Sequence, residues 1–277
     1  MMLANWRLIK ELLQMVDVAV EVIDSRDPIS TRSIKFEGLC RELGVKYLLA
    51  LNKADLIPRD VGEAWVRYFR EVDGVNAILI SAQKRLGTLR LRKLIKTLSR
   101  KKPLTVGIFG VPKVGKSTLI NTWAGRHAAG TSPFPGTQGY TRKAQLFNVG
   151  SNIYLLDTPG ILPVEGNEIE MLIRMSPVDT ARNPVAVAVR LIRRVAACNP
   201  RAFTEAYGIE STDPDTILRE LAARRGWIYR SDKEPILSES AKLIVKDYLE
   251  GKIKFYVTPP RFRNHRVVGE DPKPQQP

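Results

Sequence analysis

Cysteine is scarce in this sequence: its 277 residues include only Cys40 and Cys198, which lie far apart in the chain. Two distant cysteines supply neither a disulfide framework nor a cysteine-based metal cluster. This usage fits a reducing compartment, so we expect a cytoplasmic protein.

Long apolar runs are also missing, and no stretch approaches the length of a membrane-spanning helix. Residues 1–14 place Arg7, Lys10 and Glu11 among apolar residues, which is typical of an amphipathic helix and not of a signal peptide. We therefore expect no membrane partner. The length suggests one large or two ordinary domains, and 44% hydrophobic residues are enough for a packed core.

Acidic residues are too few to balance the basic ones, and the formal net charge is +15. The excess is densest between Lys84 and Lys102, where nine basic side chains occur without an acid. An apolar stripe with helical spacing runs through this block at Leu91, Leu94, Ile95 and Leu98. The basic groups then project on the opposite face, which favours contact with a polyanion; an ordinary solvated helix face is the alternative.

What the sequence does contain is a phosphate-binding pattern, because residues 110–118 (GVPKVGKST) fit G-x-x-x-x-G-K-[ST]. An apolar run at 104–109 precedes it and a helical pattern at 117–124 follows, as such a loop requires; a glycine-rich turn in an unrelated α/β protein is the alternative. We expect Lys116 to bridge the β- and γ-phosphates and the Ser117 hydroxyl to bind Mg²⁺. The nucleotide contacts expected from this loop are Pro112, Lys113, Val114, Gly115, Lys116, Ser117 and Thr118.

A second motif, Asn52-Lys53-Ala54-Asp55, follows a predicted strand at 46–51. The Asp55 carboxylate can accept the two adjacent N–H donors of guanine, a pair that adenine lacks, so it would favour GTP over ATP. Asn52 is expected to contact the base edge and to tie this loop to the phosphate loop, while the Lys53 stem lies across the ring. Alone, the motif is weak evidence for guanine binding. At the end of a strand, in a chain that also has a phosphate loop, it is strong evidence. A strand at 75–80 leads to Ser81-Ala82, where the Ala82 N–H is a candidate for the guanine carbonyl oxygen.

A third motif, Asp157-Thr158-Pro159-Gly160, ends a predicted hairpin with strands at 143–149 and 152–156. Asp157 is expected to hold Mg²⁺ through water, and the Gly160 N–H to sense the γ-phosphate. The loop at 128–140 is rich in Gly, Pro, Ser and Thr. Thr141 at its end is a candidate to complete the Mg²⁺ shell, with Thr137 as the rival.

The order of these motifs is unusual, because the guanine-reading residues precede the phosphate loop and Asp157 comes last. Circular permutation explains this order without changing the packed sheet, with residues 99–102 as the linker between the original ends. The sequence thus resembles the circularly permuted GTPases of the YlqF/YawG ribosome-assembly group. Residues 24–28 (DSRDP) resemble its D-A-R-x-P element with Ser25 in place of Ala; by themselves they fit a plain turn or a contact with nucleotide or partner. Further matches are Arg32, Trp65, Pro135-Gly136, Gly251-Lys252-Ile253 and Pro259-Pro260.

The resemblance implies an α/β fold with a mostly parallel, doubly wound sheet. We expect a circularly permuted Ras-like P-loop GTPase domain at 1–166, a smaller all-α RNA-binding domain at 167–258 and an extended or disordered tail at 259–277. Helical patterns occur near 168–175, 184–198, 200–207, 214–225 and 238–250. The implied function is a monomeric GTPase switch in large ribosomal subunit assembly, whose partners are ribosomal RNA and the subunit precursor. Aligned on the following strand, Thr141 takes the switch position.

Catalysis depends on residues that depart from the usual GTPase pattern. Ile161 stands where many GTPases have a water-orienting Gln, so we expect slow intrinsic hydrolysis that ribosomal particles stimulate. Lys113 occupies a position where relatives often carry an Asn resembling one that helps to bind an activating potassium ion. Its ammonium would neutralise developing phosphate charge and make turnover potassium-independent; a solvent-directed Lys113 is the alternative. The candidate catalytic residues are Lys116, Thr141, Gly160 and Lys113.

Two other functional classes stay open. One is an RNA-binding scaffold with structural GTP, and the other is an ATP-using P-loop enzyme, against which Asn52–Asp55 argues.

Overall fold

A mostly parallel sheet forms the centre of the N-terminal part of the molecule. The computed structural model describes residues 6–124, 145–158, 162–165, 167–175, 183–231 and 233–260. Its six strands lie in the order β3-β2-β1-β4-β6-β5, and all neighbours are parallel except β5 and β6. The strands are β1 (Val18–Asp24), β2 (Lys46–Asn52), β3 (Ala77–Leu79), β4 (Leu104–Phe109), β5 (Gln145–Asn148) and β6 (Ile153–Asp157). The phosphate-loop strand β4 therefore lies between β1 and β6, although β1 to β3 precede it in sequence.

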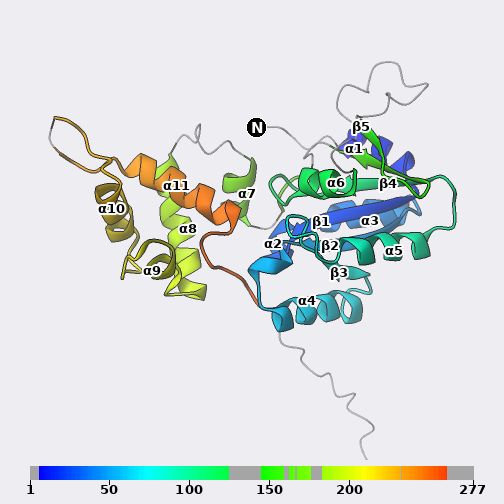
Figure 1. Ribbon diagram of the computed structural model, residues 1–277, viewed down its shortest axis with the longest axis horizontal. Coiled ribbons are helices and arrows are strands. Elements are labelled where there is room, and N and C mark those ends of the chain that lie inside the picture. The colour runs from blue at the N-terminus through cyan, green and yellow to red at the C-terminus, as the bar shows by residue number, and fades with distance from the viewer. Residues whose placement is uncertain are drawn as a thin grey trace, which may run out of the picture.

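Helices cover both faces of this sheet (Figure 1). One face packs against α3 (Ile34–Glu42) and α4 (Arg59–Glu71): the Phe36 and Phe109 rings lie 4.8 Å apart, and Trp65 and Phe69 join a cluster with β2. Helix α1 (Trp6–Gln14) lies beside α3, linked by a Lys10–Glu42 ion pair. The other face carries α5 (Thr88–Leu98) and α6 (Lys116–Ala124). The short elements are α2 (Pro28–Thr31) and η1 (Ala54–Leu56).

Burial explains the largely apolar sequence of the central strand β1. Every residue of β1 is buried, as expected for a parallel strand with helices on both faces, and this requires its near-continuous apolar sequence. Two charged residues interrupt the apolar sequence of β1: Glu21 inside the strand and Asp24 at its end. Burial, then the nearby Glu37, raises the pKa of Glu21 well above its usual range, while one carboxylate oxygen accepts the Ser33 N–H at 2.7 Å.

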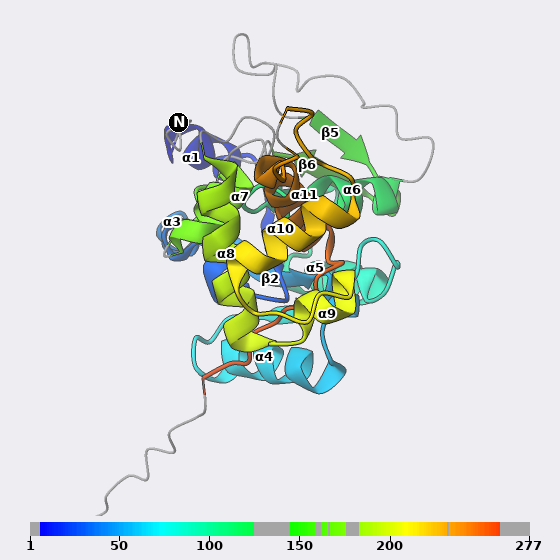
Figure 2. The same ribbon diagram turned by 90° about the vertical axis from the view of Figure 1, so that its left-hand side faces the viewer.

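The C-terminal helices surround a second hydrophobic core (Figure 2). They are α7 (Glu168–Met175), α8 (Pro184–Cys198), α9 (Ala202–Tyr207), α10 (Pro214–Arg224) and α11 (Leu237–Glu250). We call residues 167–251 the helical region. The chain then returns to the sheet: the Val257 N–H donates to the Arg26 carbonyl, and the Trp65 indole N–H donates to the Val257 carbonyl, both at 2.9 Å.

The predicted doubly wound α/β sheet and the helical patterns beyond residue 167 are confirmed. The hairpin predicted with strands at 143–149 and 152–156 is also confirmed, as the antiparallel pair β5 and β6. The strand predicted at 75–80 is shorter, because only Ala77–Leu79 pair with β2. The domain boundaries at 166 and 258 stay a prediction. Most of the predicted tail, from residue 261, lies outside the described residues. None of the helices that the structure describes is long and apolar enough to cross a membrane.

Candidate functional site

The predicted motifs meet at one edge of the sheet. Strands β1, β2, β3, β4 and β6 run parallel, so their carboxyl ends share this edge. Asp24 and Asn52 end β1 and β2, and Ser81, Gly110 and Thr158 lie within two residues after β3, β4 and β6. In open α/β sheets this edge is where ligands bind.

Asn52 joins three of these loops. Its side-chain amide donates to the Val114 carbonyl at 2.8 Å, and its amide oxygen accepts the Ala82 N–H at 2.9 Å. The Thr122 hydroxyl on α6 donates to the Ala82 carbonyl at 3.0 Å, a contact that sequence patterns did not reveal. The Asn52–Asp55 segment, the Ser81-Ala82 segment and the phosphate loop are therefore one hydrogen-bonded unit, which confirms the predicted tie between Asn52 and the phosphate loop.

The phosphate loop has the backbone geometry that its glycines allow. Gly110 has φ +142°, and a Cβ added there would lie 2.3 Å from the Val22 carbonyl oxygen. Gly115 has φ +99°, and a Cβ there would lie 2.3 Å from Asn52 Nδ2. Side chains rarely adopt such angles, and here the space is also filled, so both positions require glycine.

Lys116 is 8% exposed and lies at the start of α6, where the phosphate-loop lysine was predicted. Its ammonium donates to the carbonyls of Gly110 and Val111 at 2.7 and 2.9 Å. Burial lowers the pKa of Lys116 to about 8, against an opposing effect of Asp157. Burial also raises the pKa of Asp157, which Lys116 opposes. A buried ammonium with so little compensating charge fits a polyanionic ligand, because phosphate oxygens would offset the cost of burial.

The lysines at the two nucleotide loops adopt left-handed backbone conformations, with φ of 63° at Lys53 and 64° at Lys113. Such angles cost of order 1 kcal/mol in a residue with a side chain and concentrate at functional sites. The Lys53 ammonium contacts Asp24 Oδ2 at 3.1 Å and donates to the Leu249 carbonyl at 2.9 Å. Burial lowers the pKa of Lys53 to about 8, opposed by Asp24.

Lys113 does not simply point to solvent, which corrects that alternative. Its ammonium donates to the Ile173 carbonyl on α7 at 2.8 Å. Burial, then the charge of Arg174, lowers the pKa of Lys113. Both lysines thus reach carbonyl groups of the helical region, near the C-terminal ends of α7 and α11, where a helix carries partial negative charge.

Asp55 lies in the short η1 helix and is exposed. Its side chain forms no hydrogen bond or ion pair with the residues that the structure describes.

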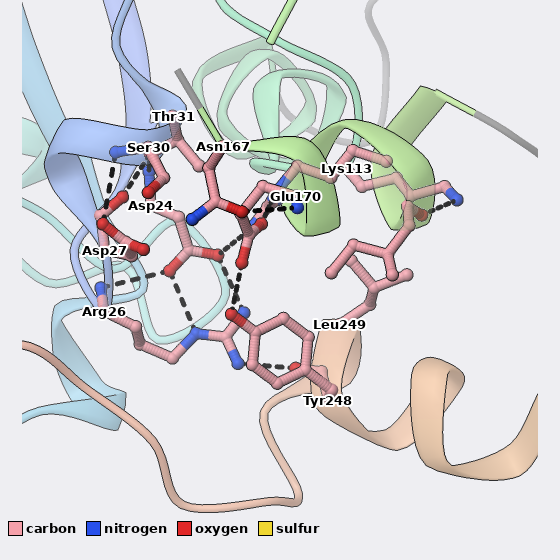
Figure 3. A network of polar contacts seen from close by, with 12 residues as sticks. Asp24, Arg26, Asp27, Ser30, Thr31, Lys113, Asn167, Glu170, Tyr248 and Leu249 are labelled. Atoms are coloured by element: carbon pink, nitrogen blue, oxygen red, sulfur yellow. Dashed lines mark hydrogen bonds and ion pairs between the residues drawn. The ribbon is translucent and has the colours of Figure 1, made fainter. Parts of the chain in front are cut away.

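Residues 24–28 form the expected turn, in which the Asp27 N–H donates to the Asp24 carbonyl at 3.1 Å and the Asp27 side chain caps α2. The charged side chains of this turn also form a buried ionic network (Figure 3). The Asp24 carboxylate accepts hydrogen bonds from Arg26 at 2.8 and 3.0 Å and from Arg174 at 3.0 Å. Burial alone would raise the pKa of Asp24, but Arg26, Lys53 and Arg174 hold it well below its usual range. This network joins the end of β1 to the helical region.

The helical region supplies the rest of the network. Arg174 also pairs with Glu170 at 2.5 Å, and Arg26 donates to the Tyr248 carbonyl at 2.5 Å. Glu170 in turn accepts from Tyr248 and Arg194, and Arg194 also contacts Asp27. Sequence reasoning missed Glu170, Arg174 and Arg194. For Glu170 and Arg174, the available signal was an acid and an arginine four residues apart inside an apolar helical pattern.

The structure describes some of the remaining predicted site residues and leaves out others. Ser117 and Thr118 lie exposed in the first turn of α6, and the Thr158 hydroxyl, which sequence patterns did not single out, donates to the Ile108 carbonyl at 2.6 Å. The predicted roles of Thr137, Thr141, Gly160 and Ile161 concern residues outside the described part of the chain.

Comparison with known proteins gives concordant matches. Residues 105–217 match the family model described as 50S ribosome-binding GTPase. An uncharacterized GTP-binding protein of Methanocaldococcus jannaschii is 32% identical over 254 residues, covering 90% of this chain and 66% of the relative. The guanine nucleotide-binding protein-like NSN1 of Arabidopsis thaliana is 31% identical, covering 93% of this chain and 49% of the relative. The chain therefore spans about half to two thirds of the length of these relatives.

Two solved structures have a similar fold. A GDP-bound YlqF has a TM-score of 0.62 and 24% identity, covering 91% of this chain and 98% of that one. The GNP-bound YlqF from T. maritima has a TM-score of 0.61 and the same identity, covering 91% and 96%.

Proposed function

Because this chain belongs to the circularly permuted Ras-like GTPases of the YlqF/YawG group, we propose that it is a GTP-hydrolysing switch in large ribosomal subunit assembly. In this proposal it binds ribosomal RNA and the subunit precursor in a nucleotide-dependent way, as a monomer in the cytoplasm. The names of its relatives support the assembly role: one is nucleolar GTP-binding protein 2 of Schizosaccharomyces pombe, 29% identical, with the match covering 92% of this chain and 48% of the relative.

The bridge made by Asn52 is the observation that carries the proposal. It fixes the base-reading loop, the Ser81-Ala82 loop and the phosphate loop relative to one another. Asp55 follows on η1, exposed and available to accept the two N–H donors of guanine. A base and its phosphates could therefore be read by one rigid unit, which is what specific GTP binding requires.

The phosphate side of the site has the residue types that GTP and Mg²⁺ need. Lys116 would contact the β- and γ-phosphates, and the loop N–H groups from Lys113 to Thr118 would surround the β-phosphate. Ser117 and Asp157 supply oxygen atoms suited to Mg²⁺, with Thr141 as the third candidate and Gly160 as the γ-phosphate sensor. When bound, Mg²⁺ would offset the negative charge of the phosphate oxygens.

Hydrolysis is expected to be slow, because Ile161 cannot orient water, and to be stimulated by ribosomal particles. The Lys113 side chain is the candidate for charge neutralisation within the loop. Its contact with the Ile173 carbonyl places one end of this lysine on the helical region. A group that binds phosphate in one arrangement and α7 in another would link turnover to the position of α7.

The switch is expected to act through α7. This helix contacts the phosphate loop through Ile173 and Lys113, and it contacts the end of β1 through Arg174 and Asp24. It also follows the Asp157–Gly160 motif in the chain, separated by a short segment. A change at the γ-phosphate therefore has a direct covalent and ionic route to the helical region.

Co-sedimentation of the full chain with large-subunit particles tests this proposal. We expect more protein on the particles with a non-hydrolysable GTP analogue than with GDP, and a steep loss of binding as salt rises. Equal binding in both nucleotide states would contradict the switch. Turnover measured with and without particles separates a GTPase from an RNA-binding scaffold with structural GTP.

A further inference from the structure

The outward side of α5 is rich in exposed basic residues. Its exposed residues follow helical spacing, so that they lie along one side of the helix. We define the α5 face as Leu86, Leu89, Arg90, Lys93, Lys96 and Arg100. Lys84 and Arg85 extend it into the preceding turn, and both are exposed.

Within the part of the chain that the structure describes, no acidic side chain pairs with the cations of the α5 face. Arg92 donates to the Gly150 carbonyl at 2.9 Å, and Lys101 pairs with Asp17 at 2.8 Å. Arg90, Lys93 and Lys96, by contrast, make no ion pair with any residue in the described part of the chain. A charge block that the fold leaves uncompensated is the electrostatic signature of a polyanion site.

Helix α4, on the opposite face of the sheet, shows that exposed cations without acidic partners are not a general property of the surface helices. It carries three exposed arginines, Arg59, Arg67 and Arg70, interspersed with Asp60, Glu63 and Glu71. Arg59 pairs with Glu63 at 2.7 Å and Arg70 with Glu71 at 3.4 Å. Two of the three α4 arginines therefore have an acidic partner, whereas Arg90, Lys93 and Lys96 have none in the described part of the chain.

The apolar side of α5 argues against a membrane as the partner. A helix that binds a bilayer inserts its apolar face, but Leu91 and Ile95 are fully buried against the sheet. What is left outside is a row of cations with two exposed leucines, Leu86 at 58% and Leu89 at 72%. Exposed cations of this kind can contact the phosphates of a nucleic acid backbone, and the leucines are available to contact sugars or bases.

We infer that the α5 face is a docking surface for the phosphate backbone of RNA. This inference rests on the proposed function for RNA as the polyanion, and it adds a binding surface outside the helical region.

The turn that precedes α5 lies on the side of the site where the base is proposed to bind. The Ser81–Leu86 turn is closed by two backbone hydrogen bonds of 3.0 Å, and the Ala82 N–H at its start donates to Asn52. Gly87 then starts α5 with φ +70°, and a Cβ there would lie 2.3 Å from the Leu79 carbonyl oxygen. None of these contacts involves the γ-phosphate side of the site. The α5 face should therefore contribute equally to RNA affinity with GDP and with GTP bound.

The experiment measures binding of the full chain to a short synthetic RNA hairpin by fluorescence anisotropy, across a salt series. It compares wild type, the α5 variant (R90Q/K93Q/K96Q) and the α4 variant (R59Q/R67Q/R70Q), each with GDP and with a non-hydrolysable GTP analogue. Both variants remove three exposed positive charges, so they differ in place and not in net charge. Guanine nucleotide affinity, which should be unchanged in both, reports that the proteins are folded.

The α5 variant should raise the RNA Kd roughly tenfold or more near 0.1 M salt and lower the salt slope by roughly 2 to 3. The factor should be the same in both nucleotide states, and the α4 variant should stay within about twofold of wild type, because distant charges are screened. An equal loss of RNA affinity in both variants, or no loss in the α5 variant, would overturn the assignment of the α5 face as an RNA-binding surface. Wild type that does not bind the RNA hairpin at low salt would overturn both the α5 face and the proposed RNA partner. Loss confined to the α5 variant, with no difference between GDP and GTP states in wild type, would support the α5 face and reject the switch.

Discussion

Arg174 donates a hydrogen bond to Asp24 at 3.0 Å although 150 positions separate them in the chain. Both side chains are 1% exposed. One residue ends the central strand of the sheet, and the other lies on the first helix after the Asp157–Gly160 motif. The pair therefore fixes the helical region at the edge where the nucleotide loops meet.

Replacing Asp24 with Asn tests the stabilising role of this pair. The variant leaves Arg26 and Arg174 buried without their shared carboxylate, so unfolding free energy should fall by about 3 to 5 kcal/mol. Chemical denaturation measures the change. Glu63→Gln is the control, because it breaks an exposed pair that is worth about 1 kcal/mol or less. A loss at Asp24 no larger than the loss at Glu63 would contradict the role of the network.

The pH dependence of stability tests the burial of Lys53. Its folded pKa of about 8 lies below the usual lysine value, so between the two values the unfolded chain binds more protons. Stability should therefore rise as pH increases from about 8 toward 10. Lys53→Met removes this contribution, so its unfolding free energy should gain less over the same range. Denaturation at pH 7 and 9 compares the two proteins, and an equal gain in both would rule out a depressed pKa at Lys53.

Gly115→Ala tests the bridge at Asn52 without touching a charged group. The new Cβ would lie 2.3 Å from Asn52 Nδ2 at a backbone φ of +99°, so the loop or the bridge must move. We expect guanine nucleotide affinity to fall roughly tenfold or more, since a misplaced loop loses several phosphate contacts. Titration with a fluorescent GDP analogue measures the effect.

Gly38→Ala is the matched control for that substitution. Gly38 lies within α3, and a Cβ there would meet nothing within 4 Å. It should leave nucleotide affinity unchanged and raise stability by roughly 0.5 to 1 kcal/mol. Similar nucleotide affinities of the two alanine variants would exclude a steric role for the Gly115 position.

Lys113 gives a prediction on monovalent ions. If its ammonium supplies positive charge at the phosphate loop, turnover should be the same in potassium and in sodium, and Lys113→Ala should lower kcat. Steady-state phosphate release in the two salts measures this. A large rate gain in potassium with wild type would reject the lysine as the source of charge.

Much of the nucleotide site could be predicted because its signals are local. Each motif occupies a few consecutive residues at the end of a recognisable strand, and parallel strands bring such ends together. Asn52, Ala82 and the 110–118 loop could therefore be assigned to one edge of the sheet from the sequence. Circular permutation changes the order of the loops and leaves their positions on that edge unchanged.

The network around Asp24 could not be predicted in the same way. Asp24 precedes a sequence that equally fits a turn, and its partners come from α7, α8 and α11. Nothing in the spacing of the chain says that Arg174 reaches β1, because that contact depends on how the helices pack against the sheet. The same holds for the Lys53 and Lys113 contacts with backbone carbonyls, since any residue provides a carbonyl group.

Competition between GTP and ATP tests most directly the claim that one rigid unit reads both the base and the phosphates. Displacement of a fluorescent GDP analogue gives the Kd of each nucleotide for wild type and for Asp55→Ala. We predict that wild type prefers GTP by roughly 10⁴ and that Asp55→Ala loses most of this preference while it still binds phosphates. Equal affinity of wild type for GTP and ATP would contradict a guanine-reading site at Asn52–Asp55.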